Sequence, residues 1–322
     1  MFSIPILLIT FNRPYHVRQV LTEIRKQKPA QLFVCQDGAR DGNQLDVERV
    51  QQVRDVITEL IDWPCELHTL FQEKNLGCGL GPAEGITWFF EHVEMGIILE
   101  DDCVPSPNFY PYCETLLEHY KNDERISIIS GCYHGENEKW KNGDTYYFSH
   151  GNHATWGWAS WRRVWKKFDY YLKDIDMTSF KKILSYYVSE LREFEFWCEL
   201  FEMTKSNRIN ESAWDFQFWF ACWRDKMLSI KPNYNLISNI GTGPDATHTF
   251  GDNPLMHRDV EPLGLWQHPA EVVQNKRADH YLHSHLEAPY EYGWSGLLRL
   301  PYRINKRIKR LVGHKGPWLN KK

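Results

Sequence analysis

Short apolar runs alternate with amphipathic stretches through the first 130 residues. Each run has the length of a buried strand and is bounded by polar or turn residues, which predicts strands at residues 4–11, 31–35, 66–71, 96–99 and 126–130. Between them, apolar residues recur at helical spacing, which predicts helices over residues 15–26, 47–61, 82–93 and 109–120. This alternation predicts an α/β fold: a mostly parallel sheet with helices on both faces.

The pattern changes after residue 130. Aromatic residues become frequent, and the spacing predicts helices over residues 159–167, 180–205 and 213–226, whereas the glycine-rich residues 235–248 predict a loop. We therefore expect one domain built from two halves, residues 1–130 and a mainly helical half at 131–250. Residues 251–322 form a C-terminal extension that ends in a basic tail.

Polar side chains follow three of the predicted strands. Asn12 and Arg13 follow the first strand, Asp37 follows the second, and Glu100–Asp102 follow the fourth. Ligands of parallel sheets bind outside the carboxyl ends of the strands, so these residues point to one site. Three adjacent carboxylates repel one another and are costly to desolvate unless a cation lies close. Mn²⁺ or Mg²⁺ would fit, because such cations prefer oxygen ligands and often share them with phosphates. The alternative is a solvated acidic turn.

Charge and cysteine content narrow the function classes. The chain has a net charge of −4, although residues 299–322 hold nine basic residues and no acidic one. The rest is therefore strongly acidic, which excludes general nucleic-acid binding. The basic tail predicts peripheral contact with an anionic membrane, or alternatively a solvated end. Eight scattered cysteines without a Cys-x-x-Cys pair are typical of a reduced, cytoplasmic protein, at most peripheral at the inner face of the cytoplasmic membrane.

Six motifs in order carry a resemblance to a known fold family. They are the segments at residues 5–14, 75–79, 97–102, 156–158, 214–215 and 239–248. With them the chain resembles glycosyltransferases of the GT-A (Rossmann-like) fold, in particular the bacterial nucleotide-diphospho-sugar transferases described as hemolytic protein HlpA-like. It is more distantly similar to N-acetylglucosaminyltransferase I. The resemblance covers about residues 3–250. It implies metal-dependent, inverting transfer of a sugar from a UDP-sugar to a glycan or lipid-linked acceptor, as in polysaccharide biosynthesis.

The resemblance also implies roles for the acidic triplet, which corresponds to the family's Asp-x-Asp metal motif. Asp102 is then the direct metal ligand, Asp101 contacts the ribose or a metal-bound water, and Glu100 contacts the sugar hydroxyls. His248 is implied as a further metal ligand, or alternatively as a structural histidine. A cation at this place would offset the charge that develops on the leaving diphosphate.

Other residues are implied to bind the nucleotide-sugar. Arg13 would contact the diphosphate, or alternatively form a surface salt bridge. Asp37 would pair with the uracil N–H, or alternatively form a turn before Gly38. Trp158 would stack on the sugar, or alternatively belong to the core. The predicted site is completed by Thr10, Asn12, Trp214, Gly241 and Gly243.

Asp215 is the candidate catalytic base. Trp214-Asp215 matches the start of the Trp-Asp-Asp-Trp segment of N-acetylglucosaminyltransferase I, although Phe216 replaces the second Asp. An inverting transfer needs a base that takes the proton of the acceptor hydroxyl. The alternative role of Asp215 is the N-cap of the helix that follows.

Two other functions remain open. A nucleotidyltransferase that makes NDP-sugars would share the fold, but that class usually carries a glycine-rich loop with a basic residue after its first strand. Here the strand ends in Thr10-Phe11-Asn12-Arg13-Pro14, without glycine. A non-catalytic carbohydrate-binding protein is the third interpretation, and the presence of Asp102 and Asp215 argues against it.

Overall fold

Residues 1–135, 143–151, 155–206, 213–242 and 257–288 of the chain are described by the structure, which is a computed structural model. Its first half is a regular alternation of parallel strands and helices. The elements are β1 (Ile6–Thr10), α1 (Pro14–Gln27), β2 (Gln31–Gln36), α2 (Gln44–Leu60), β3 (Glu66–Phe71), α3 (Gly77–His92) and β4 (Met95–Glu100). The predicted α/β class is confirmed, and every strand and helix predicted before residue 100 is present.

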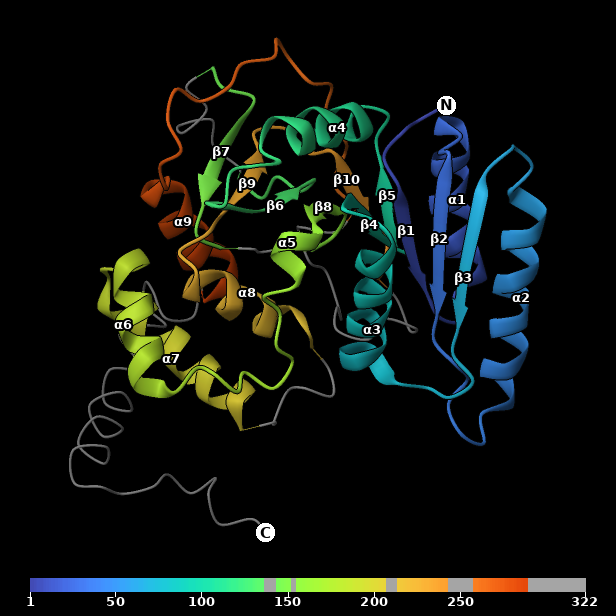
Figure 1. The fold of residues 1–322 in the computed structure, drawn as a ribbon, viewed down its shortest axis with the longest axis horizontal. Coiled ribbons are helices and arrows are strands. Elements are labelled where there is room, and N and C mark those ends of the chain that lie inside the picture. Colours follow the sequence, from blue (N-terminus) through green and yellow to red (C-terminus); the bar gives the residue numbers. More distant parts are fainter. Residues whose placement is uncertain (136–142, 152–154, 207–212, 243–256, 289–322) are drawn as a thin grey trace.

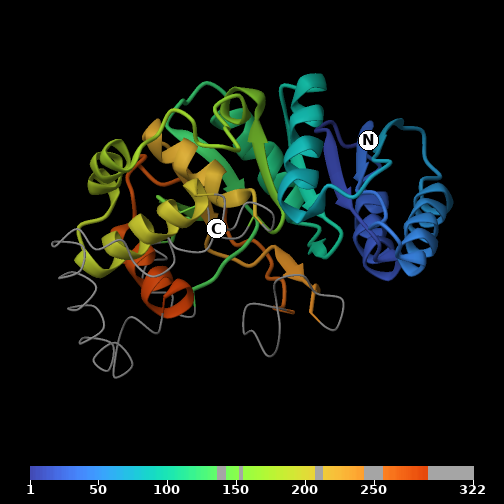
Figure 2. The same cartoon turned by 90° about the horizontal axis from the view of Figure 1, so that it is seen from below.

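The strand order places a topological switch in this half. The eight-stranded sheet runs β3-β2-β1-β4-β8-β6-β9-β7, and β1 pairs in parallel with both β2 and β4. The chain thus moves outward from β1 to β3 and then returns to the other side of β1. Because parallel crossovers are right-handed, this reversal places α3 on the opposite face from α1 and α2. Figures 1 and 2 show α1 and α2 together on one face and α3 on the other.

The segment after Glu100, which includes the second half, extends the same sheet. Its elements are β5 (Cys103–Pro105), α4 (Phe109–His119), β6 (Ile126–Ser130), β7 (Tyr146–Ser149), β8 (Trp158–Trp161), α5 (Arg162–Trp165), α6 (Met177–Tyr187), α7 (Leu191–Lys205), α8 (Asp215–Arg224), β9 (Leu228–Pro232), β10 (Ile237–Asn239) and α9 (Lys276–Leu282), followed by a π-helical turn (His283–Glu287). Strand β8 is antiparallel to both β4 and β6 and so joins the two halves. A separate ribbon pairs β5 with β10, and this pairing brings residues 103–105 against 237–239.

Two predicted helices of this half need correction. Residues 159–161 belong to strand β8, and only the short α5 follows where one helix over 159–167 was expected. Ala159, Ser160 and Trp161 are fully or nearly fully buried between β4 and β6, where strand pairing satisfies their backbone. The helix expected over 180–205 is two helices, α6 and α7, because Val188 adopts an extended backbone and Glu190 caps α7.

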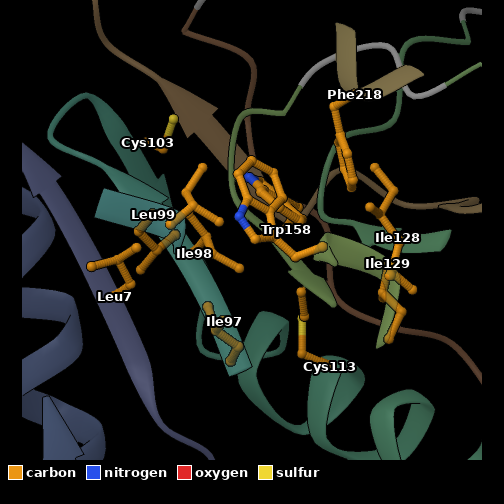
Figure 3. Packing of buried hydrophobic residues seen from close by; sticks show 14 of the residues in the cluster. Leu7, Ile97, Ile98, Leu99, Cys103, Cys113, Ile128, Ile129, Trp158 and Phe218 are labelled. Atoms are coloured by element: carbon orange, nitrogen blue, oxygen red, sulfur yellow. The ribbon is translucent and has the colours of Figure 1, made fainter. Parts of the chain in front are cut away.

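The core runs through both halves. One cluster of buried apolar residues extends from Ile4 to Ile237, and Figure 3 shows part of it, with Trp158 between Leu99 of β4 and Phe218 of α8. The described residues of the two halves thus share one core, and the extent of the domain stays a prediction. Among the helices of the described ranges, none has both the length and the apolar character that crossing a bilayer requires.

Candidate functional site

The acidic triplet and Arg13 meet at the switch point of the sheet. Arg13 lies just beyond β1, and Glu100 ends β4, where it pairs with Ile9. Asp101 and Asp102 follow directly in a turn. The crevice outside the carboxyl ends of two parallel strands, at the point where the strand order reverses, is the usual ligand site of open α/β sheets. The fold therefore places these residues where the sequence predicted a site.

Arg13 holds two of the three carboxylates. Its Nε donates to Asp101 Oδ2 at 3.3 Å, and its Nη2 contacts Asp101 Oδ1 and donates to Asp102 Oδ2 at 3.0 Å. Burial lowers the pKa of Arg13, but the two carboxylates raise it more, so the guanidinium is a permanent cation. Asp101 is buried by this pairing, whereas Asp102 retains some exposure. Of the two, Asp102 is the one that a ligand can reach.

The site has more negative than positive charge. Burial, then repulsion by Asp102 and Asp101, raises the pKa of Glu100 to about 8, and Asp215 adds to the rise while Arg13 opposes it. Asp215 therefore lies within electrostatic reach of Glu100, although 114 residues separate them in the sequence. Four carboxylates share one guanidinium here, so a divalent cation would be favoured at this place.

Asp215 is the first residue of α8. Trp214 occupies the N-cap position, and the Asp215 carboxylate accepts the backbone N–H of Phe216 at 3.0 Å. Asp215 is therefore not the N-cap of α8 in this structure. Trp214 is buried and stacks on Trp158, with ring centroids 6.0 Å apart. This packing fixes the start of α8, where Asp215 lies.

Gly241 also lies at the acidic triplet. The backbone N–H of Ile240 donates to the carbonyl oxygen of Asp102 at 2.9 Å. A Cβ on Gly241 would lie only 2.2 Å from Asp102 Oδ2, so a side chain there would displace the carboxylate. The other two residues predicted from this segment, Gly243 and His248, lie outside the described residues.

Three predicted binding residues have other contacts in this structure. Thr10 is buried and donates its hydroxyl to the carbonyl of Cys35 at 3.1 Å. Asn12 is buried and donates its amide to Asp46 Oδ1 at 2.7 Å. Trp158 is 0% exposed, which corresponds to the core alternative rather than to stacking on a sugar. Their predicted contacts with a nucleotide-sugar stay predictions.

Asp37 is engaged by the start of α3. Its carboxylate accepts the backbone N–H groups of Gly38 at 2.9 Å, Leu76 at 2.8 Å and Gly77 at 3.0 Å, and the Asn75 amide at 3.0 Å. Burial raises the pKa of Asp37, and the three backbone bonds oppose the rise. A carboxylate offers about four acceptor positions, so these donors fill it. This arrangement corresponds to the alternative in which Asp37 forms a turn before Gly38. Pairing of Asp37 with the uracil N–H stays a prediction.

Sequence reasoning missed three residues at the site: His16, Cys103 and Asn239. His16 Nε2 donates to the carbonyl of Ile240 at 3.2 Å. Burial raises the pKa of Asp101, and the charges of Arg13 and His16 oppose the rise. Cys103 and Asn239 adjoin Asp102 through the β5–β10 pairing. Cys103 directly follows Asp102 in the sequence. Its contact with Asn239 and the contact of His16 with Ile240 join segments far apart in the chain, so no local pattern could reveal them.

The donor set fits a hard divalent cation that is shared with a diphosphate. Within the described ranges, no group of three or more His, Cys, Asp or Glu side chains forms a complete metal site. Mg²⁺ and Mn²⁺ are commonly held by one or two carboxylates, with substrate phosphates and water completing the coordination. Asp102, which retains some exposure at the end of β4, can supply such a carboxylate.

No protein-family model and no curated protein matches the chain. Solved structures overlap with parts of it. HddC from Yersinia pseudotuberculosis is 9% identical, with 54% of this chain and 85% of that chain covered and a TM-score of 0.32. The inositol-1-phosphate CTP transferase from T. maritima is 10% identical, with 54% and 75% covered and a TM-score of 0.30. UDP-glucose pyrophosphorylase in complex with UDP-glucose is 10% identical, with 72% and 93% covered and a TM-score of 0.35. Because these sequence identities and TM-scores are low, the function has to be argued from the chain's own residues.

Proposed function

We propose that the chain is a metal-dependent, inverting glycosyltransferase that moves a sugar from a UDP-sugar to a glycan or lipid-linked acceptor. One observation carries the proposal. At the switch point between β1 and β4, Arg13 and Asp102 lie side by side, and Asp215 of α8 lies within electrostatic reach of Glu100. A guanidinium and a metal-binding carboxylate together can bind a diphosphate. A further carboxylate from another element can take the proton of the acceptor hydroxyl.

Each residue then has a distinct task. Arg13 contacts the diphosphate, because its fork of N–H donors matches phosphate oxygens. Asp101, buried against Arg13, orients that fork. Asp102 holds Mn²⁺ or Mg²⁺, which when bound acts as a Lewis acid that stabilises the leaving diphosphate. Glu100 contacts the hydroxyl groups of the sugar.

Asp215 accepts the proton of the acceptor hydroxyl. As the acceptor oxygen attacks C1 of the sugar, the bond from C1 to the diphosphate breaks, and the hydroxyl proton passes to the Asp215 carboxylate. Attack on the face opposite the diphosphate inverts the configuration at C1, by analogy with inverting glycosidases. The buried Trp214 beside Asp215 limits solvent there, which favours transfer over hydrolysis.

UDP binding tests the metal and nucleotide parts of this proposal. Calorimetry should show much tighter UDP binding with Mn²⁺ than in EDTA, and Asp102→Ala should abolish the difference. Asp123→Ala is the matched control, because the Asp123 carboxylate binds Arg125, two residues further along the chain. Equal UDP affinity in Mn²⁺ and EDTA for the unaltered protein would refute metal-dependent nucleotide binding.

Product analysis separates the enzyme classes. Slow hydrolysis of a UDP-sugar to UDP and free sugar, lost in Asp102→Ala, is expected of a glycosyltransferase without its acceptor. Release of pyrophosphate from a nucleoside triphosphate and a sugar 1-phosphate would instead identify a nucleotidyltransferase. The short connection from Thr10 to Pro14 counts against the latter, because α1 begins only four residues after β1 ends and no glycine lies between them.

A further inference from the structure

Asn239 connects two segments that enclose Asp102. It is the last residue of β10, is buried, and pairs with Cys103 of β5. Its side-chain Oδ1 accepts the backbone N–H of Gly241 at 2.8 Å. Its Nδ2 donates to the sulfur of Cys103 at 3.8 Å. One amide side chain thus binds both neighbours of the Asp102 carboxylate.

Each of those neighbours contacts a different oxygen of Asp102. The Cys103 thiol donates to Asp102 Oδ1 at 3.3 Å. On the other side, the Cα of Gly241 lies so close to Oδ2 that a Cβ would be 2.2 Å away.

The turn that carries Gly241 is itself fixed on both sides of Ile240. The Ile240 N–H donates to the Asp102 carbonyl at 2.9 Å, and the Ile240 carbonyl accepts from His16 Nε2 at 3.2 Å. The turn cannot shift away from Asp102 without breaking these bonds. Asp102 therefore has little freedom to change its rotamer, although it lies in a turn and not in a strand.

We propose that Asn239 is a positioning residue for Asp102: through Cys103 and Gly241 it holds the Asp102 carboxylate in the orientation that binds the metal. This inference rests on the proposed function, which assigns Asp102 to the metal. It gives roles to Asn239 and Cys103, which have none in the proposed function. Partners that orient a metal ligand typically contribute 10–100-fold to metal affinity.

Two pairs of variants test the proposal. Asn239→Ala should weaken UDP binding in Mn²⁺ by about 10–100-fold and leave UDP affinity in EDTA unchanged. Asn235→Ala is the matched control: Asn235 is equally buried at the other end of this segment, and its amide binds the carbonyl of Ile237 at 2.8 Å, away from the triplet. Cys103→Ala should reproduce the Asn239→Ala effect, whereas Cys103→Ser, which keeps a donor, should retain most of the affinity.

A crystal structure of Asn239→Ala without nucleotide gives a readout that is independent of metal binding. The Asp102 carboxylate should be rotated or divided between two positions, and it should keep one position in Asn235→Ala. An unmoved carboxylate, or Mn²⁺-dependent UDP binding equal to that of the unaltered protein, would overturn the role of Asn239. If the unaltered protein shows no metal dependence, the proposed function fails, and the crystal structures still decide the positioning. If Asn239→Ala does not fold, the comparison of Cys103→Ala with Cys103→Ser decides.

Discussion

Adding one methyl group at Gly241 should disable the metal site without unfolding the protein. Gly241 does not adopt the left-handed backbone conformation that favours glycine, so alanine can take the same φ and ψ. Its Cβ would lie 2.2 Å from Asp102 Oδ2 and 2.9 Å from Asp102 Cγ. The effect of Gly241→Ala therefore comes from this contact and not from backbone strain.

The size of the effect follows from the distances. Ordinary contact of a Cβ begins at about 3.4 Å, so the carboxylate must withdraw by about 1 Å. Such a shift breaks the bonds from Arg13 and Cys103 to Asp102, which are 3.0 Å and 3.3 Å long. A misplacement of about 1 Å at a reacting centre costs about 10²-fold in rate. We expect a loss of that order in UDP-sugar turnover and a clear loss of Mn²⁺-dependent UDP binding.

Calorimetry of UDP with Mn²⁺ and with EDTA measures the binding effect, and thermal unfolding monitors the fold. Gly264→Ala is the matched control, because its Cβ would also meet an oxygen, the hydroxyl at the far end of the Tyr234 side chain at 2.7 Å, and not a residue of the acidic triplet. Gly264→Ala should bind Mn²⁺ and UDP normally. If Gly241→Ala binds them normally too, the close packing of Gly241 against Asp102 does not control the metal site.

Three further predictions concern other parts of the chain. Asp215→Asn should lower transfer turnover by about 10²–10⁴-fold with UDP affinity and melting temperature near those of the unaltered protein; transfer at the normal rate would move the search for the base to other carboxylates, Asp245 first. His150 is buried between Glu193, at 3.1 Å, and Asp279, at 3.3 Å; burial lowers its pKa, but the two carboxylates raise it further, from 6.5 to about 10. The charged His150 therefore makes its full contribution to the free energy of unfolding below pH 6.5 and loses it as the pH rises through 10. In urea unfolding, His150→Gln should lower the free energy of unfolding by about 3–5 kcal/mol at pH 6 and by much less at pH 10. An equal loss at both pH values would contradict the raised pKa of His150. Removal of residues 299–322, with their nine basic side chains, should abolish co-sedimentation with anionic vesicles, each basic residue near the surface contributing about 1 kcal/mol; equal pelleting of a 1–298 protein would show that the tail does not bind membranes.

The periodicity of the sequence was sufficient to predict the strands and helices of the first half of the fold. Runs such as residues 96–99 are apolar throughout and are buried in a parallel sheet, so they show as strands without knowledge of their partners. In the second half the same reasoning failed at residues 159–161. This short buried segment suits a strand and a helix equally, and only its pairing with β4 and β6 decides between them.

The same distinction applies to the site. The sequence by itself determined that carboxylates would follow β4 and a guanidinium would follow β1, because a strand end can be recognised locally. It could not determine that Asp37 and Asn12 would be engaged by Asn75 and Asp46, since these hydrogen bonds depend on how the loops pack. The residue types are equally suited to a ligand and to the backbone of a neighbouring turn.

The strand order decided which residues of the site contact one another. Arg13 meets Asp102 because β4 returns to the side of β1, and Asn239 meets Cys103 because β10 pairs with β5 across 136 positions of the sequence. Contacts of this kind form only when the long connecting segments close on a common core, and their free energy comes from that core rather than from any local pattern. The sequence thus determined which chemical groups the site has, and the tertiary structure decided which of them hold one another in place.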